Sequence, residues 1–128
     1  MAWKLKRNQK ITEKLELDDG QIITIELDIP KMIKQFTQGY NAILRLKVKG
    51  AKINNENIES YYNELGEAFI NLMNIVFGED NANKILNYYD DNFIACIDNV
   101  VPFIEQVINP HFKNYNKEKM KQIKKYKG

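Results

Sequence analysis

The chain has 128 residues, a length that suits one domain. Hydrophobic residues make up 44% of it and charged residues 28%, which excludes the composition of a disordered chain. Its longest apolar run lies around residues 75–77 and falls far short of the roughly 20 residues that cross a bilayer. The net charge of +2 is too small by itself to predict a polyanionic partner. We therefore expect one folded domain with no membrane partner.

The single cysteine, Cys96, cannot form an internal disulfide, which agrees with a reducing compartment. The start of the chain is basic, with Lys4, Lys6, Arg7 and Lys10. No apolar stretch follows these residues, as it would in a secretory signal. We therefore expect a cytoplasmic protein.

Residues 11–29 have the alternating pattern of a β-hairpin around an Asp18-Asp19-Gly20 turn. Apolar residues take odd-numbered positions: Ile11, Leu15, Leu17, Ile23, Ile25, Leu27 and Ile29. A two-residue loop would place Leu17 and Ile23 on opposite faces. A three-residue loop with Gly20 in the left-handed conformation keeps all of them on one face, so we predict that register.

The next segment predicts a helix that begins at Pro30, since proline suits the first turn of a helix. Apolar residues recur there at spacings of three and four: Met32, Ile33, Phe36, Tyr40, Ile43 and Leu44. We expect this helix to cover the apolar face of the hairpin. Residues 44–49 alternate apolar and basic, so they either continue the helix or form a third strand, and Gly50 ends either element.

A second helix is predicted to run from a cap at Asn54 or Asn55 to Phe77. Its broad apolar stripe makes it the central element of the predicted core. Gly78 should end it. A short third helix then begins at residues 79–80, where two acidic side chains suit a helix N-terminus.

Asn92 is predicted to cap a last helix over residues 93–108, whose apolar residues span about half of the helical wheel. Pro102 should bend this helix, and Pro110 should end it. The expected fold class is α+β, mainly α, with an N-terminal β-hairpin followed by three to four helices. Residues 1–112 would form this single domain, and residues 113–128 a solvated, lysine-rich tail.

The inventory of reactive side chains predicts a protein that is not an enzyme. The chain has one histidine, His111, one serine, Ser60, and one cysteine, so it cannot build a Cys/His zinc site. In an unbroken helix Cys96 and His111 would lie about 22 Å apart, too far to share a proton. Paired carboxylates occur at a turn, a solvated helix face and a helix junction: Asp18-Asp19, Glu64 with Glu67, and Asp90-Asp91. We expect no cofactor and no metal.

The broad apolar arc of residues 93–108 exceeds what one neighbouring helix buries, so we predict that a partner protein covers part of it. The predicted contact residues lie on this arc and on the preceding junction: Tyr88, Tyr89, Phe103, Ile104 and Val107. The alternative is that the arc packs between the other helices of the same chain. The hairpin also offers an open edge that could pair with another chain.

The C-terminal segment contains seven lysines and one glutamate, with Tyr115 and Tyr126 among them. Lysines neutralise phosphates and aromatic rings stack on bases, a mixture typical of nucleic-acid binding. The predicted polyanion contacts are Lys117, Lys121, Lys124 and Lys125. The alternative is a solvated tail without a partner.

One local motif and the order of the elements resemble a known family. Residues 77–86 read Phe-Gly-Glu-Asp-Asn-Ala-Asn-Lys-Ile-Leu; a hairpin and helices precede them and a long apolar helix follows. This arrangement is similar to the small tail assembly chaperones of long-tailed bacteriophages, over about residues 15–110. The resemblance implies a non-enzymatic cytoplasmic protein, often an oligomer, that coats the helical tape measure protein while the tail is assembled.

The expected function is therefore that of an assembly chaperone or adaptor of phage origin, which binds helical segments of the tape measure protein by helix-in-groove contacts. Two alternatives remain open. One is a small nucleic-acid-binding protein that uses the lysine-rich tail. The other is a structural connector subunit, which would remain in the finished virion.

Overall fold

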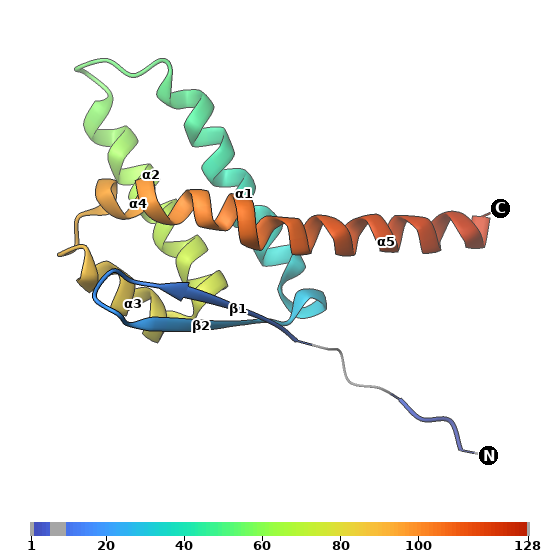
Figure 1. The fold of residues 1–128 in the computed structure, drawn as a ribbon. Coiled ribbons are helices and arrows are strands. Elements are labelled where there is room, and N and C mark those ends of the chain that lie inside the picture. The colour runs from blue at the N-terminus through green and yellow to red at the C-terminus, as the bar shows by residue number, and fades with distance from the viewer. Residues whose placement is uncertain (1, 6–9, 128) are drawn as a thin grey trace.

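The computed structural model describes residues 2–5 and 10–127, with side chains as far as Lys125. It confirms the predicted fold class, because an N-terminal β-hairpin is followed by packed helices (Figure 1). The elements in chain order are β1 (Ile11–Glu16), β2 (Ile22–Leu27), α1 (Ile29–Gly50), α2 (Ile58–Phe77), α3 (Glu79–Tyr88), α4 (Phe93–Phe103), the π-helical turn η1 (Ile104–Ile108) and α5 (Asn109–Lys127).

The hairpin has the predicted register. Leu15 pairs with Ile23, and the N–H of Leu17 donates to the carbonyl oxygen of Gln21 at 2.8 Å, which leaves a three-residue loop. Gly20 takes a φ of 91°, the left-handed conformation that the loop requires. Ile23, Ile25 and Leu27 of β2 are buried while the residues between them are exposed, so the ribbon has one apolar face.

The first helix runs to Gly50, so residues 44–49 are helical and no third strand forms among the described residues. The expected cover of the hairpin was wrong: the ribbon packs mainly on α2, and α1 packs on α2 instead. Gly39 permits a close approach of these two helices. A Cβ atom there would lie 3.3 Å from Cδ1 of Leu72 and 3.4 Å from Cδ1 of Ile75.

The second helix is the central core element, as predicted, because Phe69, Leu72 and Met73 are fully buried. Its predicted cap was wrong by a few residues. The helix begins at Ile58, and the side chain of Asn54 accepts the N–H groups of Glu56 and Asn57 in the preceding turn instead. Asparagine competes well for backbone groups in such turns, which is why its position alone does not fix a helix start.

The junctions around α3 follow the sequence prediction. Gly78 separates α2 from α3 with a φ of 80°. The side chain of Asn92 caps α4 by accepting the N–H of Ala95 at 3.2 Å. Asn81 of α3 donates to the carbonyl oxygen of Thr24 at 3.4 Å, which ties α3 to β2.

The predicted helix end at Pro110 was wrong, because α4, η1 and α5 follow one another as one continuous helix (Figure 1). The turn η1 is π-helical, with the N–H of Asn109 bonded to the carbonyl oxygen of Ile104. Pro110 follows this π turn directly, and the wider turn before it accommodates the proline, which lacks an N–H, within the continuous helix. Prolines and π turns are the common irregularities of long helices, and here they adjoin without ending the helix.

Packing explains why the helix continues beyond Pro110. Ile104, Ile108 and Phe112 recur every four residues and are all buried. The ring of Phe112 stacks on that of Phe36 in α1, with centroids 4.0 Å apart. Residues 116–125 are exposed, and this last part of α5 projects from the body (Figure 1). The boundary expected at residue 112 is therefore a change of environment within one helix.

Candidate protein-binding groove

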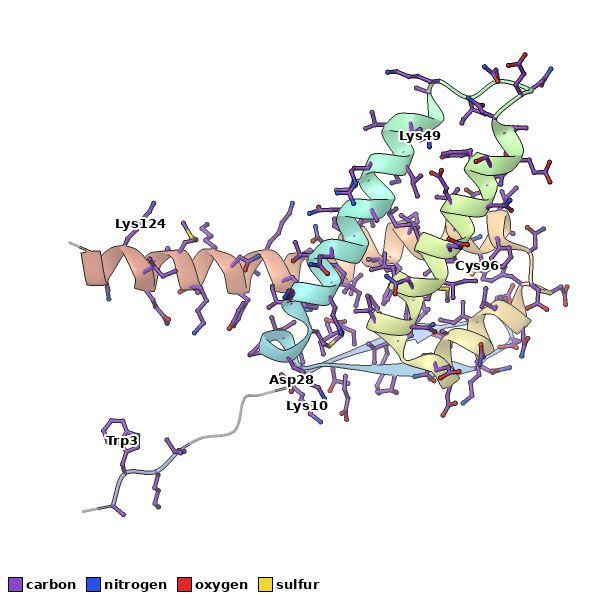
Figure 2. All side chains as sticks on the ribbon, turned by 180° about the vertical axis from the view of Figure 1, so that it is seen from behind. Trp3, Lys10, Asp28, Lys49, Cys96 and Lys124 are labelled. Atoms are coloured by element: carbon purple, nitrogen blue, oxygen red, sulfur yellow. The ribbon has the colours of Figure 1, made fainter. Side chains whose placement is uncertain are left out.

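The thiol of Cys96 lies in an environment that does not activate it as a nucleophile. Cys96 lies inside the body of the protein (Figure 2), fully buried, and this burial raises the pKa of its thiol to about 11. The thiol is thus protonated at neutral pH and unsuited to nucleophilic attack. Among the described residues, no group of three or more His, Cys, Asp or Glu side chains could hold a metal ion.

His111 pairs with a carboxylate of the hairpin instead of with Cys96. Its Nε2 lies 2.8 Å from Oε1 of Glu13, which joins α5 to β1. Cys96 and His111 are 15 residues apart on the continuous helix, about 22 Å at 1.5 Å per residue. The contact between His111 and Glu13 therefore holds two elements together and does not involve Cys96.

The two predicted contact tyrosines lie beside the hairpin turn. Tyr88 and Tyr89 meet edge to face, with ring centroids 5.0 Å apart, and both are half-buried. They line a cavity of about 290 Å³ together with Leu17 and Asp18. Burial raises the pKa of Tyr89, and the neighbouring Cys96 and Asp18 raise it further.

The other three predicted contact residues lie further along the long helix. Ile104 is fully buried, so its side chain cannot reach a partner while the fold is intact. Phe103 is half-buried, and its ring lies 6.2 Å from that of Phe77. Val107 is also half-buried against the core. The five residues therefore do not form one surface.

An apolar groove lies elsewhere, between α2 and the beginning of α4. Its volume is about 650 Å³, within the usual range for binding sites. The residues that line it come from both helices and from the junction before α4: Tyr62, Asn63, Leu65, Gly66, Glu67, Ile70, Asp91, Asn92, Phe93, Ile94 and Ile97. We call this the α2–α4 groove.

Several apolar side chains that line the α2–α4 groove are exposed to solvent. Ile94 is 52% exposed, Tyr62 46% and Phe93 40%. The polar groups along it include two carboxylates, Glu67 and Asp91, and neither makes an ion pair within the part of the chain that the structure describes. The groove therefore offers apolar contact with negative charge beside it.

The sequence contained a partial signal for this groove. The apolar arc of residues 93–108 was too broad for one neighbour, and the uncovered part of it is the N-terminal end, with Phe93 and Ile94. Ile70 likewise widens the apolar stripe of α2. Periodicity shows that a face is too wide but not which edge its neighbours leave open, so it did not single out the residues of this groove.

The four predicted polyanion contacts all lie on α5 and are exposed. Lys117, Lys121, Lys124 and Lys125 fall within about 100° of one another around the helix axis. Lys121 also lies 3.7 Å from the carboxylate of Glu118, a solvated pair one turn apart. These lysines form one face of the projecting helix (Figure 2 labels Lys124).

None of the helices in residues 10–127 combines the length and apolar character needed to span a bilayer. Comparison of the chain with protein-family models, with curated proteins and with solved structures gives no match.

Proposed function

We propose that this protein is a non-catalytic assembly chaperone or adaptor, and that it binds an amphipathic helical segment of a client protein in the α2–α4 groove. The observation that supports this most directly is the groove itself, because three large apolar side chains, Tyr62, Phe93 and Ile94, remain 40–52% exposed along it. Contiguous exposed apolar surface of this kind marks sites where another chain docks.

The form of the groove favours a helical client. It runs between two helices, and a groove of this type accepts the apolar face of an amphipathic helix through residues spaced three and four apart. Glu67 and Asp91 would favour basic side chains at the margins of that helix. The resemblance of residues 77–86 to phage tail assembly chaperones suggests the tape measure protein as the client, bound in the host cytoplasm during tail assembly.

Co-expression tests this proposal. The tape measure protein of the same genome should be more soluble when this chain is present, and Ile94→Glu should abolish that gain by placing a charge in the groove. Ile22→Glu is the matched control, because Ile22 is 59% exposed on the hairpin, outside the groove. A client that is equally soluble without this chain, or equally protected by the Ile94→Glu variant, would contradict the proposal.

A second candidate function rests on α5. Four lysines on one face of an exposed helix could neutralise phosphates of a nucleic acid, and such binding would weaken steeply with salt because counterions are released. Removal of residues 117–128 should then abolish the binding of a DNA duplex measured by fluorescence anisotropy. Unchanged affinity after this removal would exclude this function for the lysine-rich helix.

A further inference from the structure

The charge of the chain is unevenly distributed. The first ten residues carry four basic side chains and no acidic one, and residues 113–127 carry seven lysines and one glutamate. These two segments together hold +10, and since the whole chain carries +2, the residues between them hold −8. Residues 2–5 and the end of α5 leave the body on the same side (Figure 1). The charge is therefore basic toward both ends of the chain and acidic between them, and we call the projecting, lysine-rich end of α5 the basic end.

The basic end also carries apolar side chains without cover. Met120 is 54% exposed and Ile123 48%, and the two lie three residues apart beside the lysine face of α5. A helix of about twelve residues is only marginally stable in water by itself. Contact with an apolar surface would stabilise the projecting part of α5, because it would cover these two side chains.

The α2–α4 groove is complementary to this helix both in its charge and in its exposed apolar side chains. Tyr62, Phe93 and Ile94 offer exposed apolar contact, and Glu67 and Asp91 offer negative charge next to it. A lysine-bearing amphipathic helix could place its apolar residues in the groove and its ammonium groups near the two carboxylates. The groove and the end of α5 are thus complementary in hydrophobicity and in charge.

The two surfaces cannot meet within one molecule. Ile94 and Ile123 belong to the same continuous helix and are 29 residues apart, which separates them by about 43 Å at 1.5 Å per residue. Figure 1 shows the start of α4 and the end of α5 at opposite ends of this helix. Only a second copy of the chain can bring an α5 into the groove.

We propose that this protein assembles head to tail, with the projecting part of α5 of one copy bound in the α2–α4 groove of the next. Such an interface joins two different surfaces, so the assembly keeps one free groove at one end and one free helix at the other, and it can grow. The inference uses the groove of the proposed function, and a client helix would compete with α5 for it. It concerns the protein alone, so its test needs no client.

Sedimentation velocity of the full chain provides the test. The wild-type protein should show an average mass well above that of the 15.1 kDa monomer, and the mass should fall as salt is raised. A helix variant, Met120→Asp with Ile123→Asp, and a groove variant, Ile94→Glu, should each be monomeric. Ile22→Glu should assemble as the wild type does. All changed positions are exposed, and circular dichroism checks that each variant is folded.

Mixing the two monomeric variants gives the decisive result. The helix variant retains its groove and the groove variant retains its helix, so an equimolar mixture should form a complex of twice the monomer mass and nothing larger. A mixture that stays monomeric would overturn the proposal, because it would show that the two surfaces do not bind each other. A wild-type protein that is monomeric at every concentration would overturn it as well.

Discussion

The two parts of the long helix differ in what holds them. From Cys96 to Phe112 its inward residues are buried, with Ile104 and Ile108 fully enclosed, whereas residues 116–125 contact little besides solvent. The backbone conformation is helical in both parts. Tertiary packing therefore stabilises the first part. The second part depends on the helix propensity of its own residues and on any surface that covers it.

The largest expected effect is at the last buried residue of the first part. Phe112→Ala should lower the free energy of unfolding by about 3–5 kcal/mol, since it removes a buried ring and leaves a cavity against Phe36. Urea unfolding measures this change, and Lys113→Ala is the exposed control, with an effect within about 0.5 kcal/mol. A loss below about 1 kcal/mol would place Phe112 outside the core.

A smaller effect of opposite sign is expected at Pro102. This exposed proline lies inside α4 and removes a backbone hydrogen bond, so Pro102→Ala should raise the free energy of unfolding by about 1–3 kcal/mol. Pro110→Ala is the matched control, because the π turn just before Pro110 already interrupts the regular i to i−4 hydrogen bonds, so an added N–H gains less there. Equal gains at both positions would contradict this account of why the helix continues.

The stability associated with the buried thiol should depend on pH only in alkaline solution. Because the pKa of Cys96 is raised to about 11 from an ordinary value of 9.0, the folded chain keeps a proton that the unfolded chain loses. The stability associated with Cys96 is therefore complete below pH 9 and declines as the pH rises toward 11. The difference in unfolding free energy between the wild type and Cys96→Ala should change over this window, and a constant difference would argue against the burial.

The same thiol gives a simpler measurement at pH 8. Alkylation of Cys96 should be slow in the native protein and fast in urea, because the native thiol is protonated and inaccessible.

The smallest effect is expected in the second part of the helix. Removal of residues 117–128 should change the free energy of unfolding of the monomer by no more than about 0.5 kcal/mol, since the removed residues are exposed where the structure describes them. Chemical unfolding at low protein concentration measures this. A loss above about 1 kcal/mol would mean that the projecting part stabilises the body.

Local patterns predicted much of the fold. The odd-numbered apolar residues fixed the register of the hairpin, and Gly20, Gly78 and Asn92 were correctly placed at a turn, a helix end and a cap. These features depend on a few neighbouring residues, so a sequence alone can reveal them.

The errors arose where distant packing decides the outcome. The helix was predicted to end at Pro110, but the buried series Ile104, Ile108 and Phe112 keeps it intact past that residue. The hairpin was expected on α1 and packs mainly on α2. The open edge of the apolar arc also depends on which helices surround it, so the α2–α4 groove could not be located from periodicity.

The π turn η1 also determines in which direction around the helix axis the side chains after it point. Each residue of an α-helix advances the side chains by about 100°, so the wider turn at residues 104–108 sets the angular offset between everything after it and everything before it. In a purely α-helical spacing the extra residue would turn Phe112 by about 100°; the π turn absorbs it, so Phe112 still faces Phe36 and Ile123 keeps its direction. The π turn thus determines both how the start of α5 packs on the body and which way the side chains at its far end face.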